Sequence, residues 1–148
     1  MFSIRKATKD DAPFIRTLIW RVGINPIGLN WQSFVVAVHN HGIRIGCAQL
    51  KIHRDGSFEL ASVAVVPLYR HQGVADAMVR EIIYGQTPPI YLTCRGSLAS
   101  FYDRFGFIEM THLDLMPAYF RRVKRVLLWF EKRGLAKERL AVMVWSGE

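Results

Sequence analysis

The segment from residue 57 to residue 94 constrains the fold more than any other part of the chain. It reads as a long apolar strand (57–66), a sharp turn, an amphipathic helix (72–84) and a second apolar strand (90–94). Because a single helix separates the two strands, they form a βαβ unit and are expected to lie parallel. The sequence therefore predicts an α/β or α+β fold that contains one parallel strand pair.

The turn that joins the first strand to the helix is typical of an anion site. Pro67 cannot donate a ladder hydrogen bond and closes the strand, and Gly73 lets the backbone approach a ligand closely. Successive free amides at a helix start, with the positive end of the helix dipole behind them, attract phosphate groups. Arg70 and His71 lie beside them. An ordinary connection between a strand and a helix is the alternative that this turn alone leaves open.

Apolar periodicity and turn residues place the remaining elements around this unit. Further strands are expected at 3–7, 34–38, 43–52, 107–112 and 139–145, and helices at 12–22, 97–105 and 117–133. Arg54-Asp55-Gly56 marks a hairpin turn, and residues 25–31 form a loop or short helix. These elements predict a mixed, mostly antiparallel sheet of about seven strands with flanking helices, in a single domain over residues 1–148.

Composition limits the environment and the partners. The formal net charge is +8, and residues 118–139 carry eight Lys or Arg against two Glu, which favours anionic partners. No apolar run reaches the roughly 18 residues of a membrane span, and the N-terminus has no signal-peptide core. Two cysteines, Cys47 and Cys94, are too few for a disulfide scaffold or a zinc site. We therefore expect a cytoplasmic protein with no transmembrane segment and no metal.

Two short motifs resemble those of the GNAT N-acetyltransferase superfamily. The first is Arg70-His71-Gln72-Gly73-Val74-Ala75, which matches the signature Arg/Gln-x-x-Gly-x-Gly/Ala. The second, Phe101-Tyr102-Asp103-Arg104-Phe105-Gly106-Phe107, is similar to the segment Phe-Tyr-x-x-x-Gly-Phe. The opening, from Ile4 to Asp11, resembles the first strand and helix start of the family. The resemblance covers residues 3 to about 110 and implies a GNAT-like fold.

For the donor, this resemblance implies acetyl-CoA. The backbone amides of the first motif would hold the pyrophosphate. The pantetheine arm would pair with the backbone of Val63, Ala64 and Val65, in a gap between this strand and its splayed parallel neighbour at 90–94. An amide near Val65 would then stabilise the oxyanion of the reaction.

The resemblance also suggests two catalytic residues. Tyr102 would be the acid that protonates the leaving thiolate, and Glu59 the base that deprotonates the amine. Each has a structural alternative: Tyr102 as an aromatic packed on Phe107 with its hydroxyl bonded to a carbonyl, and Glu59 as a solvated carboxylate. His53 and His112 are lesser candidates for the base.

The chain departs from the family pattern in two places. Arg95 stands where many relatives carry an asparagine that helps to bind the CoA arm. It would contact a CoA phosphate or an acidic substrate, or lie in solvent. The second departure is the basic amphipathic helix at 117–133, inserted between the last two strands, which relatives join by a short hairpin.

These features favour an N-acetyltransferase that acts on a primary amine of a small molecule, peptide or protein, by direct attack in a ternary complex. One alternative is a GNAT-like docking module that keeps or has lost the CoA cleft and uses the basic helix to bind RNA, ribosome or membrane. The absence of an aromatic-rich RNA motif argues against nucleic acid. Transfer of a longer acyl group and a homodimer paired through the last strand both stay open.

Overall fold

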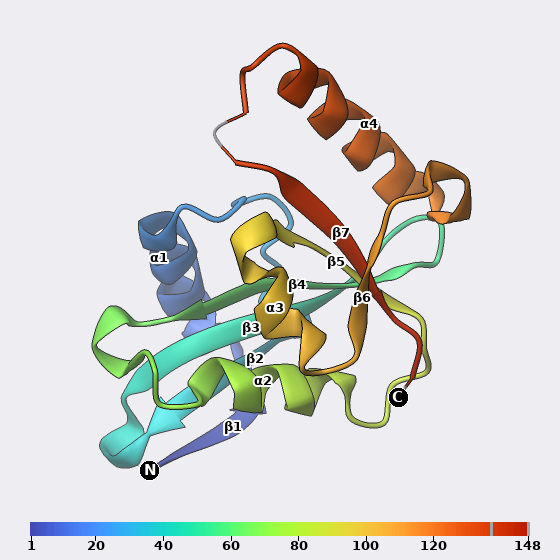
Figure 1. Ribbon diagram of the computed structural model, residues 1–148. Coiled ribbons are helices and arrows are strands. Elements are labelled where there is room, and N and C mark those ends of the chain that lie inside the picture. Colours follow the sequence, from blue (N-terminus) through green and yellow to red (C-terminus); the bar gives the residue numbers. More distant parts are fainter. Residues whose placement is uncertain (137, 148) are drawn as a thin grey trace. The chain divides into compact units, whose positions relative to one another are not determined.

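The computed structural model describes residues 1–136 and 138–147, and its elements follow the predicted order (Figure 1). The strands are β1 (Phe2–Lys6), β2 (Phe34–His39), β3 (Arg44–Ile52), β4 (Phe58–Val65), β5 (Ile90–Arg95), β6 (Phe107–Met110) and β7 (Leu140–Trp145). The helices are α1 (Ala12–Val22), α2 (Val74–Ile83), α3 (Ala99–Asp103) and α4 (Ala118–Lys132). The strands form a seven-stranded mixed sheet in the order β1-β2-β3-β4-β5-β7-β6, so the predicted fold class is confirmed.

The chain divides into two compact units. The first unit comprises residues 1–51 and 60–86, and the second comprises residues 52–59 and everything from residue 87 onward. Strand β4 contributes its first two residues to the second unit and the rest to the first. A single domain over residues 1–148 therefore stays a prediction.

In the first unit, α1 and α2 cover opposite faces of the sheet (Figure 1). Helix α1 ends at Gly23, which is left-handed as a helix C-cap requires. The buried cluster beneath α1 combines residues of the helix with residues of the strands: Ile15, Leu18, Ile19, Phe34, Val36, Cys47 and Ala64. Helix α2 contacts β1 and β2, and its Met78 lies against Gly46 on the face that α1 leaves open.

Asp11 fastens the start of α1 to the sheet. Its carboxylate accepts hydrogen bonds from the Thr8 amide (2.6 Å), from Arg5 (2.7 Å) and from Arg44. The Asp11 side chain is fully buried, whereas both guanidinium groups are partly exposed. These partners, led by the hydrogen bond from Arg5, hold the pKa of Asp11 far below its usual range.

A buried polar network fixes the loop between α1 and β2. The Gln49 amide nitrogen donates to the Gly28 carbonyl (2.7 Å) and to the Ser33 hydroxyl (2.9 Å), and its oxygen accepts from Ser62 (2.9 Å). Ser62 is left-handed, with φ of 58°, and lies within β4. Because every polar atom of the Gln49 side chain is engaged, burial of this amide carries little penalty.

In the second unit, β7 lies between β5 and β6 and pairs antiparallel with both. Strand β4 pairs parallel with β5 through two residue pairs, Phe58 with Ile90 and Glu59 with Tyr91. This pairing confirms the parallel strands that the βαβ argument predicted. Because both edges of β7 are occupied within the chain, the expectation that the last strand might pair across a dimer is wrong.

Helix α4 lies alongside β7, and its buried face matches the predicted one in part (Figure 1). Its apolar periodicity predicts a buried face of Tyr119, Phe120, Val123, Val126, Leu127 and Phe130. Phe120 is buried, and Tyr119, Val123 and Leu127 are half-buried. Val126 and Phe130 were expected in the apolar face, but they are 54% and 40% exposed. The buried face carries Phe120, which packs with Met116 and Val142, and also Lys124. Lys124 is tolerated there because its ammonium donates to the Leu140 carbonyl at 3.0 Å.

Candidate active site

The predicted anion site follows β4 as an exposed turn. After a short 3₁₀ turn at Pro67–Tyr69, residues Arg70, His71, Gln72 and Gly73 are all solvent-exposed. His71 and Gly73 are left-handed, with φ of 64° and 82°. Such a conformation is uncommon for a residue other than glycine, and it lets the chain enter the helix abruptly.

The start of α2 is open. No side chain caps the helix, and the first intrahelical hydrogen bond joins the Ala77 amide to the Gly73 carbonyl (3.0 Å). The amides of Val74 and Ala75 therefore precede the first internal donor, as at every helix start. Amides that point out of a helix N-terminus bind anions, so this geometry fits the predicted pyrophosphate site.

The end of β4 and the turn are joined by one side chain. Arg70 folds back, and its Nε donates to the Val65 carbonyl at 3.1 Å. Ala64 and Val65 are buried, while Val63 is half-buried. The structure thus brings Arg70 to the strand segment that was expected to receive the pantetheine arm.

Tyr102 lies in α3, in the second unit, and is 8% exposed. Its ring makes edge contacts with Phe101 (5.0 Å between centroids) and Phe107 (6.0 Å). Burial, and to a lesser extent the nearby Cys94, raises the pKa of Tyr102 well above its ordinary value. The phenol is therefore protonated at neutral pH, and no hydrogen bond links its hydroxyl to another of the described residues. The ring thus packs on Phe107 as the alternative role predicts, but among the described residues no carbonyl accepts the hydroxyl proton, which is free to be donated.

Glu59 lies on the face of the second unit that α4 covers, next to Tyr91 in the parallel pair. It is 8% exposed, and its Oε1 lies 2.7 Å from Nε2 of His53. The His53 ring in turn stacks on Tyr119 of α4. Glu59 is therefore not the solvated carboxylate that was its alternative. Side chains alternate along a strand, so Phe107 and Met110, three residues apart in β6, point to opposite faces. Met110 packs with α4, whereas Tyr102 packs on Phe107. Tyr102 therefore lies on the face opposite Glu59.

Arg95 ends β5 and is exposed. Hydrogen bonds from Ser97, and to a lesser extent the charge of Arg95, lower the pKa of Glu138. His112 follows β6 and is exposed, and no contact joins it to Glu59 or Tyr102. Among the described residues, no group of three or more His, Cys, Asp or Glu could hold a metal ion. No described helix is long and apolar enough to cross a membrane.

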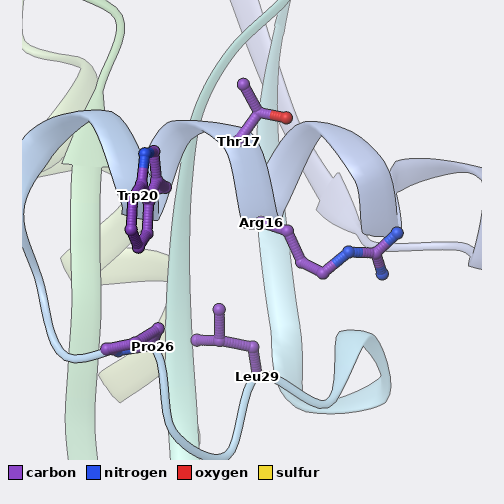
Figure 2. Close-up of a pocket in the computed structure, with 5 residues that line it drawn as sticks. All are labelled: Arg16, Thr17, Trp20, Pro26 and Leu29. Carbon is purple, nitrogen blue, oxygen red and sulfur yellow. The ribbon is translucent and has the colours of Figure 1, made fainter.

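A shallow hollow of about 390 Å³ lies in the first unit, between α1 and the loop after it. Figure 2 shows Trp20 and Arg16 on the helix, above Pro26 and Leu29 of the loop. Trp20 is 78% exposed, so the hollow is open to solvent.

A known protein family matches the central part of the chain. The acetyltransferase (GNAT) domain model matches residues 30–109, more than half of the chain. This chain belongs to the GNAT family. Acetyl-CoA is accordingly the donor, and N-acetyl transfer is the class of reaction. The matched range includes the turn after β4 and Tyr102, but not α4, the inserted helix.

Solved structures agree on the fold. The chain is similar to Mycobacterium tuberculosis Rv2747 in complex with CoA, at 22% identity and a TM-score of 0.74, over 97% of this chain and 98% of that one. It is also similar to N-acetylglutamate synthase from Neisseria gonorrhoeae complexed with coenzyme A and N-acetyl-glutamate, at 22% identity and a TM-score of 0.72. This match covers 98% of the chain but only 35% of the synthase.

A third relative is the ribosomal-protein-S18-alanine N-acetyltransferase from Escherichia coli, at 19% identity and a TM-score of 0.64, over 98% of this chain and 93% of that one. No curated protein matches the chain in sequence. At these identities the structural likeness shows the GNAT fold alone.

The sequence favours His53 only weakly as a site residue, and it predicts Tyr119 only as part of the apolar face of the helix at 117–133. A signal for His53 was present in the hairpin turn at 54–56. The His53 amide donates to the Ser57 carbonyl (2.9 Å), so Glu59 lies diagonally opposite, two residues further along. Diagonal neighbours across a hairpin are within reach of long side chains. The stacking of Tyr119 had no such local signal.

Proposed function

We propose that this GNAT protein transfers the acetyl group of acetyl-CoA to a primary amine, by direct attack within a ternary complex. The observation that carries the proposal is the open, uncapped start of α2 after the left-handed Gly73. It lies inside the segment that the family model matches. A helix start of this kind holds phosphate through backbone amides without a metal.

On the donor side, the amides from Arg70 to Ala75 bind the pyrophosphate, and the backbone of Val63, Ala64 and Val65 binds the pantetheine arm. Arg70 is held at Val65 by its hydrogen bond. Arg95, exposed at the end of β5, binds a CoA phosphate or a carboxylate of the acceptor. Holding both substrates in one complex removes the entropy of their association from the chemical step.

The proton transfers use one residue on each face of the second unit. Glu59 takes a proton from the acceptor ammonium, directly or through one water, and the amine nitrogen attacks the thioester carbon. As the C–S bond breaks, Tyr102 gives its hydroxyl proton to the sulfur, and the second amine proton restores Tyr102. Glu59 releases its proton to solvent. The products are an N-acetyl amide, CoA thiol and one proton.

The acceptor is proposed from charge and from relatives. A net charge of +8 favours an acidic acceptor over a basic one. The names of the relatives mention N-acetyl-glutamate and the alanine of ribosomal protein S18. The first amines to test are therefore L-glutamate and short peptides that begin with alanine, with acidic and basic second residues.

The test is to incubate the protein with acetyl-CoA and each amine, to follow the release of free thiol, and to confirm the acetylated product by mass. Acetyl-CoA at about 100 times its Kd should stabilise the fold by about 2.7 kcal/mol. If acetyl-CoA neither shifts the melting temperature nor loses its acetyl group to any amine, the proposed function is wrong.

A docking function is the second candidate, and the solvent face of α4 is the observation that favours it. This face carries exposed basic and apolar residues and no acid: Arg122, Arg125, Val126, Trp129, Lys132 and Arg133. The Arg133 guanidinium lies over the Trp129 ring, 4.0 Å from its centroid. Anionic vesicles and RNA are the probes, and docking of either kind should weaken as salt rises. Binding to neither would leave acetyl transfer as the sole function proposed.

A further inference from the structure

The partner of Glu59 is His53, which precedes the hairpin turn between β3 and β4. Nε2 of His53 lies 2.7 Å from Oε1 of Glu59, and the two side chains are 14% and 10% exposed. A carboxylate at this distance accepts the Nε2 proton, so the ring carries its hydrogen on Nε2. No hydrogen bond joins Oε2 to any other described residue. One oxygen of the carboxylate is therefore held and the other is left for a ligand or water.

The His53 ring is itself held by the inserted helix. Tyr119 stacks on it with the centroids 3.6 Å apart and the planes 15° from parallel, and Phe120 contacts it edge-on at 5.6 Å. Two aromatic neighbours at right angles to each other prevent the imidazole from rotating away from Glu59. Burial raises the pKa of Tyr119, and the charge of Glu59 adds to the rise, which agrees with a carboxylate close to this ring.

The first turn of α4 is pinned to the same hairpin through its backbone. The Asp55 carboxylate accepts the Tyr119 amide (3.0 Å) and also the Ser57 amide (2.9 Å). These bonds, led by the one from the Ser57 hydroxyl, lower the pKa of Asp55 to about 2, so the carboxylate is ionised at neutral pH. The contact that orients Tyr119 is therefore charge-assisted and stronger than a neutral hydrogen bond.

We propose that His53 is a positioning residue for Glu59, and that α4, through Tyr119, sets the position of His53. This inference rests on the proposed function, in which Glu59 is the base. It gives the inserted helix an indirect role in acetyl transfer, through the position of His53. Orientation of a catalytic group matters because a displacement of about 1 Å can cost about 10²-fold in rate.

The decisive comparison is between His53→Gln and His53→Leu. Gln keeps a donor nitrogen near the position of Nε2, whereas Leu fills similar space with no donor. With an accepted amine, His53→Leu should lower kcat about 10²-fold and leave KM for acetyl-CoA unchanged. His53→Gln should recover most of that loss. A purely structural role predicts instead that both variants lose activity only as far as they lose stability.

The contribution of α4 is tested with Tyr119→Phe and Tyr119→Leu. Phe keeps the stacked ring and should retain kcat, whereas Leu should lower it in the same direction as His53→Leu. Tyr84→Leu is the matched control, because Tyr84 is 84% exposed and lies at the end of α2, distant in sequence from both His53 and Tyr119. Equal kcat for Tyr119→Leu and Tyr119→Phe would contradict the proposal that α4 sets the position of His53.

A spectroscopic measurement is independent of turnover. In ¹⁵N-labelled protein, the His53 ring should show the Nε2–H tautomer, and Glu59→Gln should change that signal. If wild-type protein acetylates an amine but His53→Leu keeps its kcat, this inference is wrong and the proposed function stands. If wild-type protein acetylates no amine, both are wrong.

Discussion

Gly73 and Gly23 hold the same left-handed backbone conformation at the ends of two helices. Gly23 closes α1 with φ of 74°, and Gly73 opens α2 with φ of 82°. An added Cβ would meet no atom within 4 Å at either position. Both positions thus require a left-handed backbone, but only Gly73 lies at the proposed pyrophosphate site.

Alanine substitutions at these two glycines distinguish an effect on folding from an effect on acetyl-CoA binding. Gly73→Ala and Gly23→Ala should each lower the free energy of unfolding by about 1–2 kcal/mol, the cost of a side chain in this conformation. Only Gly73→Ala should also weaken acetyl-CoA binding, by about tenfold, because the amides of the turn would move. Urea denaturation and calorimetric titration measure the two effects. Equal acetyl-CoA affinity in both variants would show that the turn at Gly73 does not bind the pyrophosphate.

Tyr102→Phe tests the proposed acid. Loss of the hydroxyl should lower kcat about 10²-fold and leave acetyl-CoA binding nearly unchanged, because the buried ring is kept. Tyr84→Phe, at an exposed tyrosine, is the control.

The pH dependence provides a second check on Tyr102. Its raised pKa keeps the hydroxyl protonated above the ordinary tyrosine pKa of about 10. The rate should therefore show no fall between about pH 9 and 10 that depends on Tyr102. A fall in that window that disappears in Tyr102→Phe would contradict the assignment of a raised pKa.

Asp11→Asn tests the ion pairs at the start of α1. Because Arg5 and Arg44 are partly exposed, we expect a loss of about 2 kcal/mol at pH 7, less than for a fully buried pair. The folded pKa of Asp11 is lowered, so its contribution is complete above the unfolded value near 3.9 and is lost as pH falls below it. Urea denaturation at pH 7 and pH 3 should show the difference shrinking, with the exposed Asp10→Asn as control.

The two cysteines should be almost unreactive in the folded protein. Burial raises the pKa of Cys47 to about 12, and that of Cys94 to about 11. Since the thiolate is the reactive form, a thiol reagent at neutral pH should modify them slowly in native protein and rapidly in urea. Fast modification of native Cys94→Ser or Cys47→Ser protein would identify an exposed thiol. Slow modification keeps the background low when CoA thiol is measured.

Local signals in the sequence predicted most of the elements. Gly23, Gly73, Pro67 and the hairpin at 54–56 mark ends and turns because their backbone requirements are local. The position of β7 between β5 and β6 was not predictable in this way, since strand order depends on pairing and not on the pattern within a strand. The open start of α2 followed from the motif, whereas the left-handed His71 did not.

The face that α4 buries is predicted only in part, for a related reason. Periodicity assumes that a lysine faces solvent, but Lys124 reaches the Leu140 carbonyl of a strand sixteen residues later. The contact between Tyr119 and His53 also joins elements far apart in the chain. Both depend on how the helix packs, and the sequence pattern of the helix alone does not contain that information.

The place of β7 has a consequence for synthesis on the ribosome. β5 and β6 emerge first, and each is paired with β7, which follows β6 by about 30 residues. At about 5–20 residues per second, the nascent chain holds those two strands without their common partner for about 2–6 seconds. The α4 segment emerges within that interval, so its aromatic residues stay uncovered until β7, the strand on which they pack, follows.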